Sequence, residues 1–149
     1  MECKDVLLSL REKKGISQQE LADRMFVTRQ AVSRWERGET LPSSDLLKKL
    51  SEVFQVSINT LLGSPRQLIC QSCGMPLTDD VMGHDADGSI NQDYCKWCYD
   101  GGAYVQDCTV EEMIAFCMDI MAKEQGLDPE KVRPYLQDFL PKLARWKKA

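Results

Sequence analysis

The sequence predicts a mainly α-helical protein in two parts. The first part is a bundle of five short helices that contains a helix-turn-helix. The second is a small cysteine-rich ribbon with short β hairpins, followed by a helical hairpin. Three observations predict this architecture. Apolar residues recur at helical spacing through residues 1–63, two Cys-x-x-Cys pairs lie between residues 70 and 98, and helical patterns with capping signals occupy residues 109–149.

The domain boundaries follow from the same patterns. Gly63, Ser64 and Pro65 are typical of a loop, so a linker is expected where the helical spacing stops. We expect a helix-turn-helix domain at 1–63, a linker at 64–69, a ribbon at 70–108 and a helical segment packed with the ribbon at 109–149.

The first two helices are short and have clear ends. Apolar spacing over residues 6–14 predicts a helix that Gly15 ends. Ser17 followed three residues later by Glu20 is a capping-box pattern, which predicts that a second helix begins at about Ser17 and lasts barely two turns.

The third helix has two chemically different faces. Thr28 can cap it, and Ala31, Val32 and Trp35 share one apolar face. Its opposite face is polar and basic, with Arg29, Gln30, Ser33, Arg34 and Arg37. The short turn between the second and third helices predicts a helix-turn-helix.

Two more helices complete the bundle. Gly38 ends the third helix, and Ser43 or Ser44 can cap a fourth that continues through Phe54. A last short helix is expected at residues 57–62.

Charge differs between the two parts of the chain. The formal net charge is −4, yet residues 1–63 hold 10 Lys and Arg against 9 Asp and Glu, whereas residues 64–149 hold 9 against 14. The two parts are therefore expected to have different partners. We see neither a signal peptide nor a membrane span, so a cytoplasmic location is expected, and seven cysteines there favour metal or redox chemistry over disulfides.

The basic face of the third helix fits the chemistry of duplex DNA. A helix enters the major groove, where Arg pairs with guanine and Gln with adenine, so we expect Arg29, Gln30 and Arg34 to contact bases. The alternative is a solvated helix face. Three further polar residues are expected to bond a base or phosphates and to set the register: Ser33, Thr28 and Gln18.

The segment from "SQQELA" through "TRQAVSRWERG" to "LP" resembles the DNA-binding domain of Cro/C1-type repressors, also called the xenobiotic-response-element family. The resemblance covers residues 4–63 and implies a lambda-repressor-like fold. It aligns Gln18, Thr28, Arg29, Gln30, Ser33 and Arg34 with DNA-contacting positions. It also implies a structural ion pair between Arg11 and Glu36, which we exclude from the site.

Two departures from that family matter. Phe26 stands at a turn position often held by Gly, which predicts a strained or altered turn. The loop at residues 39–44 has no Lys or Arg, so few phosphate contacts are expected there. The near-neutral charge of residues 1–63 favours binding as a homodimer over two half-sites, through an interface that the sequence does not identify.

The second part carries a candidate metal site. Cys70 and Cys73 form one pair, Cys95 and Cys98 the other, and 21 residues separate the pairs. This spacing predicts one structural Zn²⁺ held by four thiolates. A zinc-linked redox switch, an iron–sulfur cluster and disulfides are the alternatives. Because a four-cysteine site has no open coordination position, we expect no enzyme.

The remaining thiols and the one histidine have simpler interpretations. Cys108 and Cys117 are expected to be buried, Cys3 to be buried or an exposed thiol, and His84 to lie in a surface loop. Two helices should follow the ribbon. The first is capped by Thr109, and the second begins near Asp128 and is interrupted by Pro141.

The segments "CQSCGMPL", "YCKWCYDGGAYVQDCTVEEMIAFC" and "LPKLARWKK" resemble a zinc-ribbon domain of bacterial proteins that is sometimes fused to such DNA-binding domains. The resemblance covers residues 68–147 and implies zinc at the four paired cysteines, without an activity. The whole sequence thus predicts a transcriptional regulator, by the simplest mechanism a repressor, with a dimerisation or effector module. Alternatives are an antitoxin or adaptor that binds a protein partner, and a regulator that senses zinc or thiol oxidation.

Overall fold

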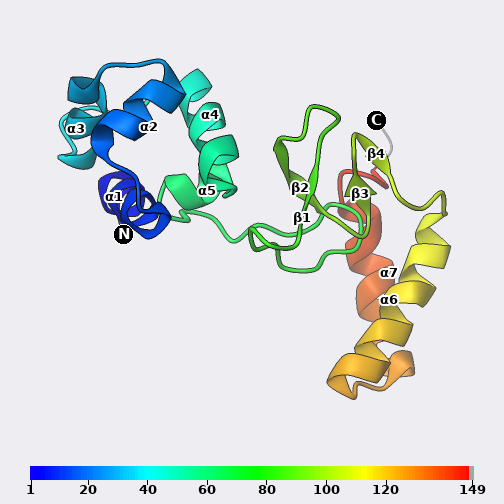
Figure 1. Ribbon diagram of the computed structural model, residues 1–149. Coiled ribbons are helices and arrows are strands. Elements are labelled where there is room, and N and C mark those ends of the chain that lie inside the picture. The colour runs from blue at the N-terminus through cyan, green and yellow to red at the C-terminus, as the bar shows by residue number, and fades with distance from the viewer. Residues whose placement is uncertain (148–149) are drawn as a thin grey trace. The chain divides into compact units, whose positions relative to one another are not determined.

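The computed structural model describes residues 1–147 and is drawn in Figure 1. Its contacts divide the chain into two compact units, with the main boundary between Gln67 and Leu68. The described residues contain seven α-helices, one 3-10 helix and four short strands, which confirms the predicted fold class.

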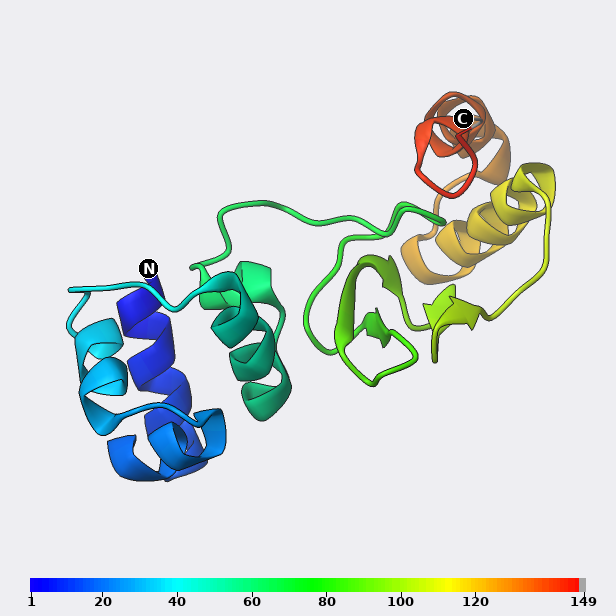
Figure 2. The same cartoon turned by 90° about the horizontal axis from the view of Figure 1, so that it is seen from above.

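Five helices build the first unit, and Figure 2 shows them from above. Their bounds are α1 (Cys3–Lys14), α2 (Gln18–Met25), α3 (Arg29–Glu36), α4 (Ser44–Phe54) and α5 (Ile58–Leu61). Side chains cap the helices where the sequence predicted. Ser17 accepts a hydrogen bond from the Glu20 amide in a complete capping box, Thr28 accepts one from the Ala31 amide, and Ser43 caps α4.

The core of the first unit is continuous across its helices. Cys3 of α1 is part of it, so this thiol is buried rather than exposed. The other fully or almost fully buried side chains are apolar and come from all five helices: Leu7, Leu21, Ala22, Met25, Val32, Trp35, Leu50 and Leu61. Because α3 contacts both α1 and α2, its orientation is fixed by two helices.

The second unit contains two small β structures ahead of its helices. Strand β1 (Met82–His84) pairs with β2 (Ile90–Cys95). Strand β3 (Tyr99–Asp100) pairs antiparallel with β4 (Ala103–Tyr104), so that Tyr99 lies opposite Tyr104.

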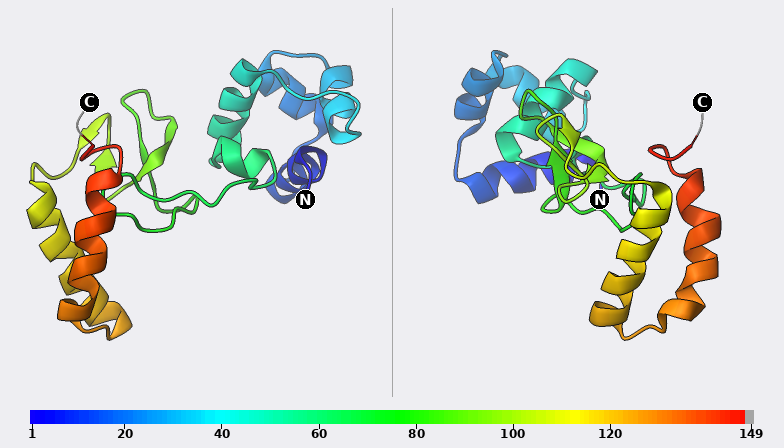
Figure 3. Two further views of the ribbon diagram at one scale, coloured as in Figure 1. Left: turned by 180° about the vertical axis from the view of Figure 1, so that it is seen from behind. Right: turned by 90° about the vertical axis from the view of Figure 1, so that its right-hand side faces the viewer.

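A helical hairpin follows the strands, as predicted. Helices α6 (Val110–Gln125) and α7 (Pro129–Phe139) lie side by side in Figure 3, and the 3-10 helix η1 (Leu140–Lys142) follows α7. Thr109 caps α6 and Asp128 caps α7. Within residues 1–147, no helix combines the length and the apolar character that a membrane span requires.

Candidate nucleic-acid interface and metal centre

Helix α3 has one buried face and one open face. Val32 is fully buried and Trp35 is 5% exposed, which fixes this side of the helix in the core. Burying these two side chains stabilises the unit by about 1.5–3 kcal/mol each. The helix therefore cannot rotate its polar side inward without losing that burial.

The open face of α3 forms a shallow depression of about 300 Å³. Arg29, Gln30 and Arg34 are exposed there, as the sequence predicted, and Ser33 is half-buried between them. A fifth residue completes the lining, because Arg37 follows Ser33 by four positions and lies on the same face. We call this surface the basic face, defined by Arg29, Gln30, Ser33, Arg34 and Arg37.

The two other predicted contact residues lie at helix N-termini. Thr28 is exposed, and its Oγ1 accepts the Ala31 N–H at 3.2 Å. Gln18 begins α2 and does not line the depression; its Nε2 donates to Glu36 Oε2 at 2.9 Å. Whether any of these residues touches DNA stays a prediction.

Gln18 is held by the ion pair that the family resemblance implied. Arg11 Nε donates to Glu36 Oε1 at 2.5 Å and Nη2 donates to Oε2 at 3.1 Å, while Nη1 donates to the Ile16 carbonyl at 2.9 Å. The two charged side chains are only 13% and 5% exposed. The hydrogen bonds to Glu36 raise the pKa of Arg11, although burial opposes this. The pair joins α1 to α3, and the bond from Gln18 adds α2.

Arg37 was not among the predicted contact residues, although its spacing from Ser33 and Arg34 could have identified it. Its Nη1 donates to Ser33 Oγ at 2.8 Å, and its Nε and Nη2 donate to the two carboxylate oxygens of Glu39 at 2.8 and 3.2 Å. The bond to Glu39 raises the pKa of Arg37 and lowers the pKa of Glu39. The basic face therefore includes one arginine that already holds an anion.

The turn before α3 is altered in the way that the sequence predicted. Phe26 ends α2 in the left-handed conformation, with φ 56° and ψ 40°. Its side chain is 87% exposed, and the Lys49 Nζ lies 5.6 Å from the ring centroid. Glycine adopts this backbone conformation without a steric cost, whereas a Cβ makes it unfavourable.

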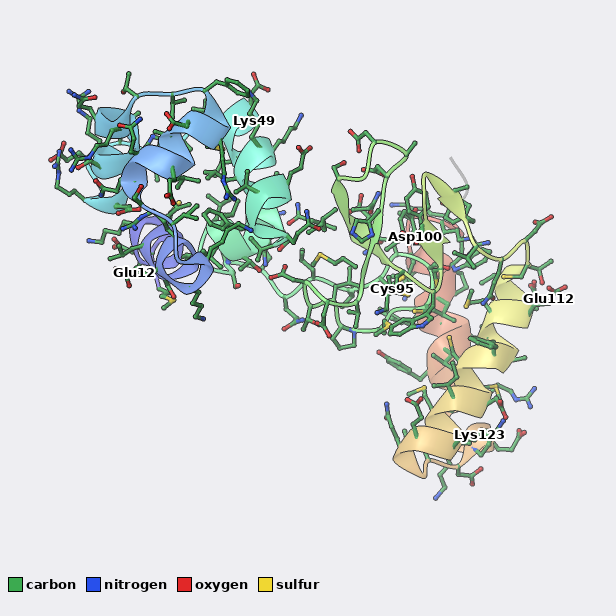
Figure 4. All side chains as sticks on the ribbon, viewed as in Figure 1. Glu12, Lys49, Cys95, Asp100, Glu112 and Lys123 are labelled. Carbon is green, nitrogen blue, oxygen red and sulfur yellow. The ribbon has the colours of Figure 1, made fainter. Side chains whose placement is uncertain are left out.

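The four paired cysteines meet in the second unit. Their Sγ atoms all lie within 4.8 Å of one another, and Cys73 Sγ is 3.9 Å from Cys95 Sγ. Figure 4 labels Cys95 at the end of β2. A tetrahedral zinc site with bonds of 2.3 Å places its sulfur atoms about 3.8 Å apart. Cys70, Cys73, Cys95 and Cys98 therefore fit one structural Zn²⁺.

Electrostatics also favour a cation among these thiols. Hydrogen bonds from the neighbouring thiols, that of Cys73 first, lower the pKa of Cys70. The hydrogen bond with Cys70 in turn raises the pKa of both Cys73 and Cys98, and repulsion by the negative charge of Cys70 adds to this effect. A divalent cation removes that repulsion and lets all four sulfurs ionise.

A glycine allows the first cysteine pair to turn tightly. Gly74 has φ 79°, and its N–H donates to the Cys70 carbonyl at 2.9 Å. A Cβ at Gly74 would lie 2.6 Å from the Phe139 ring, so α7 packs where only glycine leaves space.

A segment far along the chain covers the first cysteine pair. Ser72, which is fully buried between the two cysteines, is held by Arg145 and Trp146. Arg145 Nη1 donates to Ser72 Oγ at 3.0 Å, and Trp146 Nε1 donates to the Ser72 carbonyl at 2.7 Å. The Arg145 N–H also donates to the Gln71 carbonyl at 3.1 Å. We call residues 144–147 the closing segment; no local pattern in the sequence predicts its contacts.

The remaining thiols and His84 lie outside the four-sulfur group. Cys117 is buried, and its Sγ is 3.8 Å from the Cys73 carbonyl oxygen. Burial raises the pKa of Cys117 to about 11. Cys108 is half-buried. His84 Nδ1 lies 3.2 Å from Asp100 Oδ1, and within residues 1–147 His84 does not join the candidate metal ligands.

Comparison with known families confirms both resemblances. A family model described as "Putative zinc ribbon domain" matches residues 69–147, and one described as "Helix-turn-helix" matches residues 7–61.

Curated relatives match about two fifths of the chain. The HTH-type transcriptional activator BcrR of Enterococcus faecalis is 40% identical over 62 residues, which are 42% of this chain and 30% of BcrR. YonR of Bacillus subtilis strain 168, a prophage-derived HTH-type transcriptional regulator, is 41% identical over 56 residues, 38% of this chain and 52% of YonR. The match thus spans about half or less of these curated relatives.

One solved structure is also similar. The P22 c2 repressor, crystallised with a synthetic operator, is 33% identical to this chain, and the match covers 43% of this chain and 97% of that chain with a TM-score of 0.42.

Proposed function

We propose that this chain, which belongs to the zinc ribbon domain family over residues 69–147 and carries a helix-turn-helix domain at residues 7–61, is a sequence-specific DNA-binding regulator of transcription. The proposal includes no enzymatic activity. Four thiolates close the coordination shell of a zinc ion and leave no position for a reacting water.

One observation carries the DNA part of this proposal. The apolar face of α3 is fixed in the core, so Arg29, Gln30 and Arg34 stay exposed together around one depression. Side chains of these types on an exposed helix can read base edges in the major groove. The relatives are named as transcriptional regulators, which supports the same function.

Phosphate contacts would then set the register. Thr28 lies at the N-terminus of α3, where backbone amides favour anions, and Ser33 lies within the basic face. Gln18 Nε2 donates one of its two hydrogens to Glu36. The second hydrogen would donate to a phosphate oxygen. We propose contacts from Gln18, Thr28 and Ser33 to the backbone on this basis.

The second unit would supply a platform rather than a DNA surface. Residues 64–149 carry 14 acidic against 9 basic side chains, which favours a protein partner over a polyanion. The simplest partner is a second copy of the chain, which would place two α3 helices on two half-sites and let the dimer repress a promoter by occluding it. With zinc bound, Cys70, Cys73, Cys95 and Cys98 would hold this platform folded.

The acidic second unit also supports a second candidate function. As an antitoxin or adaptor, the chain would bind a different protein through residues 68–147 and use its DNA domain to regulate its own operon.

The proposed function is tested by selection: the zinc-loaded protein is used to select a preferred operator from a pool of random duplexes. We expect Arg29→Ala and Arg34→Ala each to weaken operator binding by about 1–3 kcal/mol, with a smaller loss on random duplex. Arg24→Ala is the matched control, because it removes the same charge from an exposed position on α2 outside the basic face. Equal losses for all three variants, or no selected sequence, would refute base reading by α3.

A further inference from the structure

Arg37 differs from the other arginines of the basic face because it is bound to a carboxylate. The two Arg37 nitrogens Nε and Nη2 face the two carboxylate oxygens of Glu39 at 2.8 and 3.2 Å, in a fork-like arrangement. Arg37 Nη1 is held by Ser33 Oγ at 2.8 Å. Three hydrogen bonds therefore fix the guanidinium at the edge of the depression.

This arrangement is stronger than a typical exposed ion pair. Single-contact pairs on a protein surface contribute little, but bidentate pairs between arginine and carboxylate are the exception. The anion also affects more than Arg37. The pKa of Glu39 is lowered mainly by the hydrogen bond from Arg37 and additionally by the charge of Arg34. Glu39 therefore stays ionised at neutral pH and partly offsets the positive charge of the basic face.

An arginine side chain in this geometry can also bind phosphate. Arginine pairs with carboxylate and phosphate oxygens in the same bidentate geometry, so the two groups compete for the Nε and Nη2 edge of Arg37. Arg37 lines the depression together with the residues proposed to contact DNA. A DNA phosphate that pairs with this edge of Arg37 replaces Glu39, and one that approaches from another side is repelled by the negative charge of Glu39.

From these contacts we infer that the Glu39 carboxylate competes with the phosphates of DNA for Arg37. This competition, which we call masking of Arg37, lowers the affinity of the domain for DNA of any sequence. The inference rests on the proposed function. It adds to the same site a residue, Glu39, that lowers the affinity of the site for the DNA backbone. The effect matters because random genomic sequence competes with any operator, and that competition is carried by phosphate contacts. With Arg37 masked, binding depends more on base contacts by Arg29, Gln30 and Arg34.

The test compares four variants by fluorescence anisotropy on a labelled random-sequence duplex across a salt series. Glu39→Gln keeps the shape of the side chain and removes its charge. Glu52→Gln is the matched control, because it removes the same charge from an exposed position on α4 outside the basic face. Arg37→Gln and the double variant Glu39→Gln/Arg37→Gln show whether the effect passes through Arg37. Glu39 and Arg37 are exposed, so these changes leave the fold intact.

We expect Glu39→Gln to tighten random-duplex binding by about 3- to 10-fold and to steepen the slope of log affinity against log salt by about 0.9, as one added phosphate contact does. Glu52→Gln should produce neither change. In the Arg37→Gln background, Glu39→Gln should have no effect.

Three outcomes decide the inference. If Glu39→Gln binds like the unmodified protein or like Glu52→Gln, while the unmodified protein binds duplex DNA, the masking is refuted and the proposed function stands. If the gain persists in the Arg37→Gln background, Glu39 repels the backbone directly and does not act through Arg37. If neither the unmodified protein nor Glu39→Gln binds duplex DNA at low salt, the proposed function itself fails.

Discussion

Replacing Trp146 by Phe tests how the closing segment contributes to zinc binding. The change keeps an aromatic ring and removes one hydrogen bond, the 2.7 Å contact from Trp146 Nε1 to the Ser72 carbonyl. Ser72 is fully buried, so water cannot replace the lost donor without rearrangement. Leaving a buried carbonyl unpaired costs about 1–3 kcal/mol.

That cost should appear as weaker zinc binding. The contact needs the turn that brings Cys70 and Cys73 to one ion, and metal binding is coupled to folding in sites of this kind. The metal-bound form therefore loses the full 1–3 kcal/mol, which corresponds to a zinc dissociation constant raised about 5- to 150-fold. Competition with a chromophoric chelator measures this ratio at equilibrium.

Trp97→Phe is the matched control for Trp146→Phe. Trp97 lies between Cys95 and Cys98, but its side chain is 51% exposed and the Lys96 Nζ lies 5.0 Å from its ring centroid. Its replacement should leave zinc affinity within about 2-fold, as is usual for a surface change. Equal zinc affinity for Trp146→Phe and the unmodified protein would show that the closing segment packs on the ribbon without contributing to the site.

Three further predictions concern stability and thiol chemistry. Arg11→Met should destabilise the first unit by about 3–5 kcal/mol, because it leaves the buried negative charge of Glu36 without a positive partner. The Arg11→Met/Glu36→Leu double variant should recover most of this loss, as thermal unfolding would show. Phe26→Gly should raise the unfolding free energy by about 0.5–1 kcal/mol, because glycine adopts the left-handed conformation without strain and the exposed Phe26 ring contributes little burial. An unchanged or lower midpoint of thermal unfolding would contradict the assigned strain. In the zinc-loaded protein at pH 8, iodoacetamide should label half-buried Cys108 before buried Cys117, and labelling of Cys117 should increase only as the pH rises towards its pKa of about 11, as mass spectrometry of peptides would show.

Local signals in the sequence were sufficient for most of the fold. Ser17, Thr28 and Thr109 cap helices where the sequence placed them, because a cap depends on a hydroxyl and an amide three residues apart. The metal site was predicted equally well, since each Cys-x-x-Cys pair is recognised from four consecutive residues. The basic face followed from helical periodicity.

Contacts that depend on the folded chain could not be read in this way. The pairing of Arg37 with Glu39 depends on the path of the chain after α3, which spacing alone does not specify. The bonds from Arg145 and Trp146 to Ser72 join residues 73 and 74 positions apart, and no local pattern marks such partners. Gln18 illustrates a third case, because its helix position was predicted but its bond to Glu36 was not.

The distance along the chain between Ser72 and the closing segment affects the order of events during synthesis. The first unit can bury its core once residues 1–67 have been made, since every residue of that core lies within this stretch. The ribbon has all four sulfurs by Cys98 but lacks the groups that cover Ser72 until residues 144–147 have left the ribosome. A partly made chain therefore presents thiols that can take up metal or be oxidised before their cover exists, so secure metal loading comes late in biogenesis.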